Sequence, residues 1–282
     1  MSFVSPPPML DIARLFPELE PLARTTVRLH PRRGNPGVRD SSVSGPLLWP
    51  ADEPWPWCMA SSEHDGPNAY QPLLQVFARD APTMFFPDGC DLLQLLWCPN
   101  EACSPTGDAL AGCPRPLARW RASSDVTDVQ GSAPEPEVVF DEWFPRNPCV
   151  VSPEPVTEYP YLTDLPQELR ERIRAWEPTV GLPGHEGSYQ SSLSTVPGTK
   201  TGGHPQWGAL VDPYWPDCVC GRRMTYLLTV NSDETGAGQS RWSRHDEPRW
   251  REDDGHDLVI KSDLLAFACI HCPAAPLDYL AT

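Results

Sequence analysis

Proline restricts the folding of this chain more than any other feature, since it occupies 36 of the 282 positions, against a usual share of about 5%. Its ring fixes φ and removes a backbone donor, so it ends or kinks a helix. The sequence therefore predicts short strands joined by rigid turns. Only residues 164–177 show a convincing helical pattern, with Asp164 as the expected N-cap. Four apolar residues fall on one face of that helix: Leu165, Leu169, Ile173 and Trp176.

Two stretches about 160 residues apart share an order of motifs. Residues 201–230 contain a glycine pair, a Pro/Trp-rich loop, a C-x-C-G turn and an apolar run; residues 45–58 and 71–76 hold a looser version. Each continues to a strand-like run that closes on Cys-Pro, at 92–99 and 264–273. This order indicates a duplicated module. Chance is the alternative, because Trp and Pro are abundant here.

The expected fold is α+β and β-rich, an internally duplicated antiparallel sheet module with few short helices. The first half is expected at residues 1–150, with a repeat core of about 40–100, and the second at 151–282, with a core of about 195–275. The two are expected to form one compact body. Strands are predicted at 27–29, 73–77, 91–97, 138–140, 225–230, 258–260 and 264–269. Residues 145–160 are expected to be irregular.

The formal net charge is −16, from 38 acidic and 22 basic residues. A nucleic-acid-binding surface needs clustered Lys and Arg, which this sequence does not supply, so no nucleic-acid partner is expected. An acidic surface favours a basic partner through electrostatic complementarity. Solubility alone is the other interpretation of the charge.

The N-terminal segment M-S-F-V-S-P-P-P has neither the charged nor the apolar region of a signal peptide. No stretch approaches 18 continuous apolar residues, so no membrane span is expected. We therefore expect a cytoplasmic protein, in which ten cysteines serve as thiols or metal ligands rather than disulfides.

Two short cysteine pairs form the strongest candidate site: Cys218-x-Cys220 and Cys269-x-x-Cys272. Four thiolates suit tetrahedral Zn²⁺, and a closed set of this kind is structural because it leaves no position for a catalytic water. Gly221 would let the first turn fold tightly round the metal. The C-x-C spacing is tighter than usual, and four unmetallated cysteines are the alternative.

The first half holds a second, less regular set of cysteines: Cys58, Cys98, Cys103 and Cys113. Their spacing leaves open whether they bind another metal. Cys90 and Cys149 resemble small hydrophobic residues instead.

Signatures of common enzyme classes are missing, including G-x-S-x-G, H-E-x-x-H and the phosphate-binding glycine loops, so a non-enzymatic protein is expected. The runs 63–65 and 253–257 carry metal-compatible side chains and are interpreted first as exposed turns. An open cleft with His204 or His256 beside a carboxylate would favour an enzyme.

Tryptophans gather in two loops, 49–57 and 207–215. They either cover the ends of a sheet, held rigid by the prolines, or line a groove that takes an extended peptide. Four residues would contact that peptide: Trp49, Trp55, Trp207 and Trp215. The groove would make the chain a protein- or peptide-binding module, chaperone-like or an immunity protein that neutralises a toxin domain.

Two patterns resemble the YwqG-like family of bacterial proteins of unknown function. They are K-T-G-G-H-P-Q-W followed by P-D-C-V-C-G-R-R-M-T-Y-L-L-T-V, and Q-P-L-L-Q-V followed by F-P-D-G-C-D-L-L-Q-L-L-W-C-P. Their layout is distantly similar to the eukaryotic programmed cell death protein 2 group. The resemblance implies a β-rich duplicated fold. For the eukaryotic relatives it implies a chaperone that holds a basic ribosomal protein, and for the bacterial ones immunity or regulatory partners of toxins. It supplies no catalytic residues.

Overall fold

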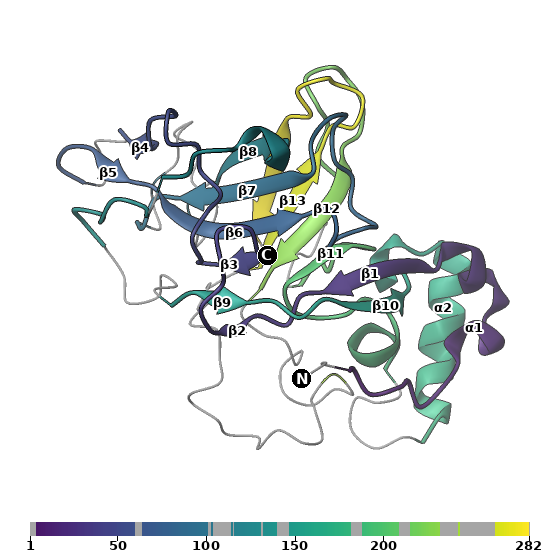
Figure 1. Ribbon diagram of the computed structural model, residues 1–282. Coiled ribbons are helices and arrows are strands. Elements are labelled where there is room, and N and C mark those ends of the chain that lie inside the picture. The colour runs from purple at the N-terminus through teal and green to yellow at the C-terminus, as the bar shows by residue number, and fades with distance from the viewer. Residues whose placement is uncertain are drawn as a thin grey trace.

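Two six-stranded antiparallel sheets dominate the computed structural model of the chain (Figure 1). The structure describes residues 4–59, 64–100, 103, 114, 116–130, 132–139, 147–181, 188–208, 215–231, 242 and 263–281. Helices in this part of the chain are few and short. The predicted β-rich class, with antiparallel sheets and few short helices, is confirmed.

The strands of each sheet lie in the following spatial order, from one edge of the sheet to the other. The C-terminal sheet runs β10 (Glu154–Glu158), β1 (Arg24–Arg28), β11 (Lys200–Gly202), β12 (Thr225–Val230), β13 (Leu264–Ala268) and β14 (Leu277–Ala281). The N-terminal sheet runs β2 (Arg32–Arg33), β9 (Cys149–Val150), β3 (Ser42–Val43), β6 (Gln71–Phe77), β7 (Leu92–Trp97) and β8 (Leu117–Arg121). A separate ribbon pairs β4 (Trp57–Cys58) with β5 (Asn68–Ala69).

The two sheets share a pairing order. Four consecutive neighbours follow chain order in each, β3-β6-β7-β8 and β11-β12-β13-β14. The second strand of each run has a register shift near its start, between Pro72 and Leu74 in β6 and between Tyr226 and Leu228 in β12. A shared strand order does not show that the two halves superpose, so internal duplication stays a prediction. The expected boundary near residue 150 does not separate the sheets, because β1 pairs with β10 and β11.

The main core lies between the two sheets, whose strands cross in Figure 1. Alternate residues of β7 and β13 enter one cluster of buried side chains: Leu93, Leu95, Trp97, Leu264, Ala266 and Ala268. The other residues of these strands are also buried, because loops cover the outer faces. A strand covered on both faces is mostly apolar, which explains the hydrophobic runs of β13 and of β7, where Gln94 is the one polar residue and is hydrogen-bonded to the Leu48 carbonyl.

A smaller cluster covers the outer face of each sheet. On the N-terminal sheet it contains Leu47, Trp49, Trp55, Cys58, Ala69, Tyr70, Leu96, Cys98 and Cys103. On the C-terminal sheet it contains Trp207, Cys218, Met224, Tyr226, Leu265, Phe267, Cys269 and Leu280. Each outer cluster therefore combines tryptophan with cysteines, and the cysteines lie at one end of the sheet.

Helices pack at the end of the C-terminal sheet, beside β1 and β10 (Figure 1). They are α1 (Ile12–Leu15), η1 (Pro17–Leu22), η3 (Leu162–Asp164), α2 (Gln167–Trp176), η4 (Glu177–Thr179) and η5 (Tyr189–Leu193); η2 (Ser123–Asp125) follows β8. The predicted helix exists as α2, and its apolar face is in contact with Phe16 and Leu19. The predicted cap is wrong: Pro166 is the N-cap, and the Asp164 carboxylate accepts a hydrogen bond from Trp207 Nε1 at 2.8 Å.

The sequence pattern did not predict the two edge strands of the C-terminal sheet, β10 and β14. Residues 154–158 form β10 although an irregular segment was expected, and Pro155 is tolerated because an edge strand has one side that needs no ladder hydrogen bond. β14 occupies the opposite edge. Residues 138 and 139 are not in a strand, and 258–260 lie outside the described residues. No helix in the described part of the chain has the length and apolarity needed to span a bilayer.

Candidate metal centres

The two cysteine pairs predicted from the sequence come together at one end of the C-terminal sheet. Cys218 and Cys220 lie on the turn before β12, while Cys269 and Cys272 lie on the turn after β13. Because β12 pairs antiparallel with β13, these turns meet. All four Sγ atoms lie within 4.8 Å of one another.

The sulfur spacing in this cluster is that of a metal site. Cys218 Sγ is 3.8 Å from Cys272 Sγ, and Cys220 Sγ is 3.6 Å from Cys269 Sγ. Four sulfurs around a tetrahedral Zn²⁺ at about 2.3 Å are separated by about 3.8 Å. A disulfide would bring two sulfurs to about 2.05 Å. The cluster could therefore hold a metal ion.

Tight turns hold the cysteines in place. Gly221 has φ +78°, in the left-handed region that favours glycine, and its N–H donates to the Cys218 carbonyl at 2.8 Å. Cys218 N–H in turn donates to the Arg222 carbonyl at 2.8 Å. On the second turn, Ala275 N–H donates to the Cys272 carbonyl at 2.8 Å. The expected role of Gly221 in a tight turn is thus confirmed.

The thiols influence one another's ionisation. Hydrogen bonding with Cys269 and its neighbours raises the pKa of Cys272 to about 12. Burial acts to raise the pKa of Cys269, but the His271 backbone amide and the other thiols outweigh it and lower that pKa to about 7. The Cys269 thiol thus has a lower pKa than the Cys272 thiol and ionises first of the two. A bound divalent cation would displace the protons of the remaining thiols and compensate the negative charge of the thiolates so formed.

A second cluster lies at the end of the N-terminal sheet and contains Cys58, His64, Cys98 and Cys103. Its four ligand atoms also lie within 4.8 Å of one another, and all four residues are buried. Sequence spacing found the three cysteines but missed His64, which it placed in an exposed turn. Cys113, the expected fourth member, lies outside the described residues.

His64 is oriented by its own turn. Its Nδ1 lies 2.7 Å from the Gly66 carbonyl oxygen, which can only accept, so Nδ1 carries a proton, and in the neutral ring Nε2 keeps its lone pair. Nε2 lies 3.7 Å from Cys98 Sγ. A carbonyl that accepts from one ring nitrogen and so aims the other at a metal is the usual support of a histidine ligand. The sequence signal that could have revealed His64 as a ligand was its position six residues after Cys58, in a turn that contains Gly and Pro.

The tryptophans expected to line a groove lie inside the protein. Trp49, Trp55 and Trp207 are 1%, 7% and 0% exposed, and Trp215 is half-buried. Trp49 packs against Trp55 at 4.9 Å between ring centroids, and Trp207 against Trp215 at 5.5 Å. The groove interpretation is therefore wrong for the three buried rings, since a partner cannot reach them. The three rings instead pack in the clusters on the outer faces of the sheets, whereas the other interpretation placed them at the ends of a sheet.

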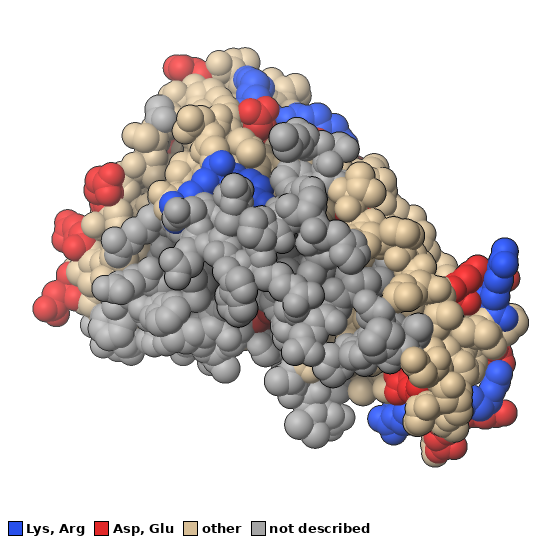
Figure 2. Space-filling model, turned by 90° about the horizontal axis from the view of Figure 1, so that it is seen from below, with Lys and Arg blue, Asp and Glu red and all other residues tan. Residues whose placement is uncertain are grey.

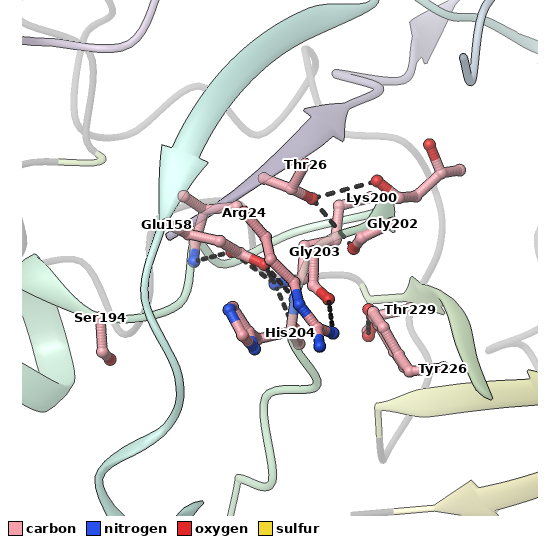
Figure 3. Close-up of polar contacts among 12 residues, drawn as sticks. Arg24, Thr26, Glu158, Ser194, Lys200, Gly202, Gly203, His204, Tyr226 and Thr229 are labelled. Atoms are coloured by element: carbon pink, nitrogen blue, oxygen red, sulfur yellow. Dashed lines mark hydrogen bonds and ion pairs between the residues drawn. The ribbon is translucent and has the colours of Figure 1, made fainter. Parts of the chain in front are cut away.

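His204 lies in a buried polar network rather than in an open cleft (Figure 3). Its Nε2 is 2.9 Å from the Leu22 carbonyl oxygen, and its backbone N–H donates to Glu158. Burial lowers the pKa of His204 to about 4, so the ring is neutral near pH 7. The ring thus faces a backbone carbonyl and not a carboxylate. His256 and the run 253–257 lie outside the described residues.

A cavity of about 460 Å³ lies between the N-terminal segment and β10. Ser5 and Glu154 line it, and the Ser5 hydroxyl donates to Glu154 Oε2 at 2.6 Å. The same hydroxyl accepts from Arg28 at 2.7 Å, while His30 Nε2 lies 2.9 Å from Glu154. Ser5 and His30 thus both contact the Glu154 carboxylate.

Comparison with known proteins finds no family model and no curated sequence that matches this chain.

Proposed function

We propose that Cys218, Cys220, Cys269 and Cys272 hold one structural Zn²⁺, and that the protein is a metal-stabilised scaffold that binds a protein partner. The sulfur spacing carries this proposal, because it matches a tetrahedral four-thiolate site. Four protein ligands leave zinc no position for water, so such a site stabilises structure and does not catalyse. Tetrahedral sulfur sites take zinc or iron, and metal analysis of the purified chain separates the two.

The metal would join the turn before β12 to the turn after β13. Both turns carry an apolar side chain at the tip: Val219 is fully exposed, at 104%, and Ile270 is 41% exposed. Each of these residues lies directly beside metal-ligand positions in the sequence. We propose that this pair, held in place by the metal, is the contact point for the partner in place of the buried tryptophans.

The partner is proposed to be a protein or peptide with a basic surface. The chain carries a net charge of −16, and charge of one sign steers a partner of the other sign. Figure 2 shows Asp and Glu side chains around the margin of one face, with Lys and Arg side chains also exposed there and at its upper centre. Reduced thiols and zinc also fit a reducing compartment, so we place the protein in the cytoplasm.

Affinity capture with the zinc-loaded full chain tests this proposal. The matched control is the double variant Val219→Ser/Ile270→Ser, which changes two exposed tips and leaves the four cysteines in place. We expect the wild type to retain a reproducible basic protein and the variant to lose it at unchanged zinc content and Tm. Failure to retain any protein reproducibly, or equal retention by both chains, overturns the binding proposal. The identity of the captured protein separates a chaperone client from a toxin domain.

A further inference from the structure

The N-terminal sheet carries its buried Cys/His cluster where the C-terminal sheet carries its four cysteines. Cys58 ends β4 and His64 lies between β4 and β5, both ahead of β6 in the chain, and Cys98 and Cys103 lie after β7. Likewise, Cys218 and Cys220 precede β12, and the other pair follows β13. The strands β6 and β7 are antiparallel neighbours, as β12 and β13 are. Both clusters therefore connect a loop before one strand to the end of the next.

The geometry of the first-half cluster fits a metal independently of that comparison. His64 Nε2 lies 3.7 Å from Cys98 Sγ. A sulfur and a nitrogen bound to the same tetrahedral Zn²⁺ are about 3.6 Å apart, given bonds of about 2.3 and 2.0–2.1 Å. His64 Nδ1 is held by the Gly66 carbonyl, and Cys98 Sγ lies 3.7 Å from the Asn68 side-chain amide. Such outer contacts orient metal ligands and stabilise a thiolate.

We propose that Cys58, His64, Cys98 and Cys103 form a second metal site, a closed Cys₃His site that takes Zn²⁺. Three thiolates and one imidazole are a common ligand set for structural zinc. This site does not depend on the four-cysteine site, since the two sets share no residue and lie on different sheets. It fastens the ribbon β4–β5 to the end of β7 and so closes the outer cluster around Trp49 and Trp55.

The ligands of the two sites differ in how exposed they are to solvent. Cys58, Cys98 and Cys103 are each 1% exposed and His64 is 7% exposed. In the other site Cys220 is exposed and Cys272 is half-buried. A chelator or thiol reagent reaches an exposed ligand first, so the Cys₃His site will release its metal more slowly than the four-cysteine site.

The metal content of the reduced full chain, purified with zinc, tests the proposal. We expect two zinc ions per chain in the wild type, one in Cys220→Ser/Cys272→Ser and one in Cys58→Ser/Cys98→Ser. A wild-type chain with one zinc, which Cys58→Ser/Cys98→Ser still retains, overturns the second site and leaves the first intact. If only Cys220→Ser/Cys272→Ser loses zinc relative to the wild type, the second site is likewise overturned and the first is left intact.

A second measurement needs no variant at the buried cysteines and so does not depend on their folding. Zinc release from the wild type is followed during titration with a mercurial thiol reagent. We expect two equal phases, the slower of which persists in Cys220→Ser/Cys272→Ser. Cobalt substitution of that variant will give the spectrum of a tetrahedral site with three thiolate ligands. Adding His64→Cys to the same variant will give a four-thiolate site with stronger thiolate-to-metal absorption. A single phase, or a variant that binds no cobalt, overturns the proposal.

Discussion

Lys200 Nζ lies 2.8 Å from Glu158 Oε2, and both side chains are completely buried. The ammonium group also donates to Glu158 Oε1 at 3.1 Å and to the His204 carbonyl at 2.8 Å, which uses all three of its protons (Figure 3). Glu158 accepts further hydrogen bonds from the backbone N–H groups of Val196 and His204. Burial raises the pKa of Glu158 and lowers that of Lys200, while the ion pair opposes both shifts. The pair fastens β10 to β11, and its hydrogen bonds with His204 extend the contact to the segment that follows β11.

Removing one member of this pair should destabilise the fold strongly. We expect Lys200→Met to lower the free energy of unfolding by about 3–5 kcal/mol, because the Glu158 carboxylate would be left buried without its counter-charge. Urea denaturation measures the change. The control is Lys200→Met/Glu158→Leu, which removes both charges and should recover part of the loss. A single variant within about 1 kcal/mol of the wild type would contradict the prediction.

His204 should make the fold sensitive to acid. Its pKa is about 4 in the folded chain, against an ordinary value of 6.5, so the unfolded chain binds more protons between these values. Stability is fully present above pH 6.5 and is lost as the pH falls toward 4, by up to about 3 kcal/mol. Comparing His204→Asn with the wild type between pH 7.5 and 4.5 isolates this contribution. We expect a smaller fall of Tm in the variant, and parallel curves would contradict the prediction.

Gly203 and Gly221 form a matched pair of glycines, with φ of +77° and +78°. A Cβ at Gly203 would collide with Glu158 Oε1 and lie 2.7 Å from Thr26 Cβ, whereas a Cβ at Gly221 meets nothing within 4 Å. Both alanine variants carry the same backbone strain of about 1–2 kcal/mol. We expect Gly203→Ala to lose at least about 2 kcal/mol more than Gly221→Ala in denaturant unfolding, because the collision displaces a buried ion pair. Equal losses would contradict this account.

The burial of Trp207 can be tested against a surface role. Trp207 is fully buried, stacks on Phe267 at 6.1 Å and donates its indole N–H to Asp164. We expect Trp207→Ala to lower the free energy of unfolding by about 3–5 kcal/mol. The control Trp57→Ala removes a ring that is 41% exposed and should cost less than about 1 kcal/mol. A stable Trp207→Ala chain would mean that the ring does not support the outer cluster.

The four-cysteine cluster was predictable because local spacing determines most of it. Each pair lies within a single turn, so only one tertiary fact was needed, namely that the strands carrying the turns are neighbours. Adjacent pairing of strands close in chain order is common. The buried runs of β7 and β13 were predictable for a related reason, since an almost wholly apolar strand must be covered on both faces.

The Cys₃His cluster was only partly predictable. Cys58 and Cys103 are far apart in the chain, and His64 joins them only because the β4–β5 ribbon folds over the end of β7. The tryptophan loops were ambiguous because a ring beside prolines has the same sequence signature inside or outside the protein. Which of the two holds depends on whether a sheet face needs cover, and that is settled by packing.

The amino-acid sequence alone determined the class of fold, since prolines exclude long helices and apolar runs of strand length demand burial on both faces. It also determined that Cys218 and Cys220 stay together, as Cys269 and Cys272 do, because one turn joins each pair. Only the tertiary structure decided that β1 lies in the C-terminal sheet, that Lys200 meets Glu158, and that His64 meets Cys98. These contacts join residues 30 or more positions apart, and the energy of such contacts depends on how whole sheets pack rather than on any local pattern.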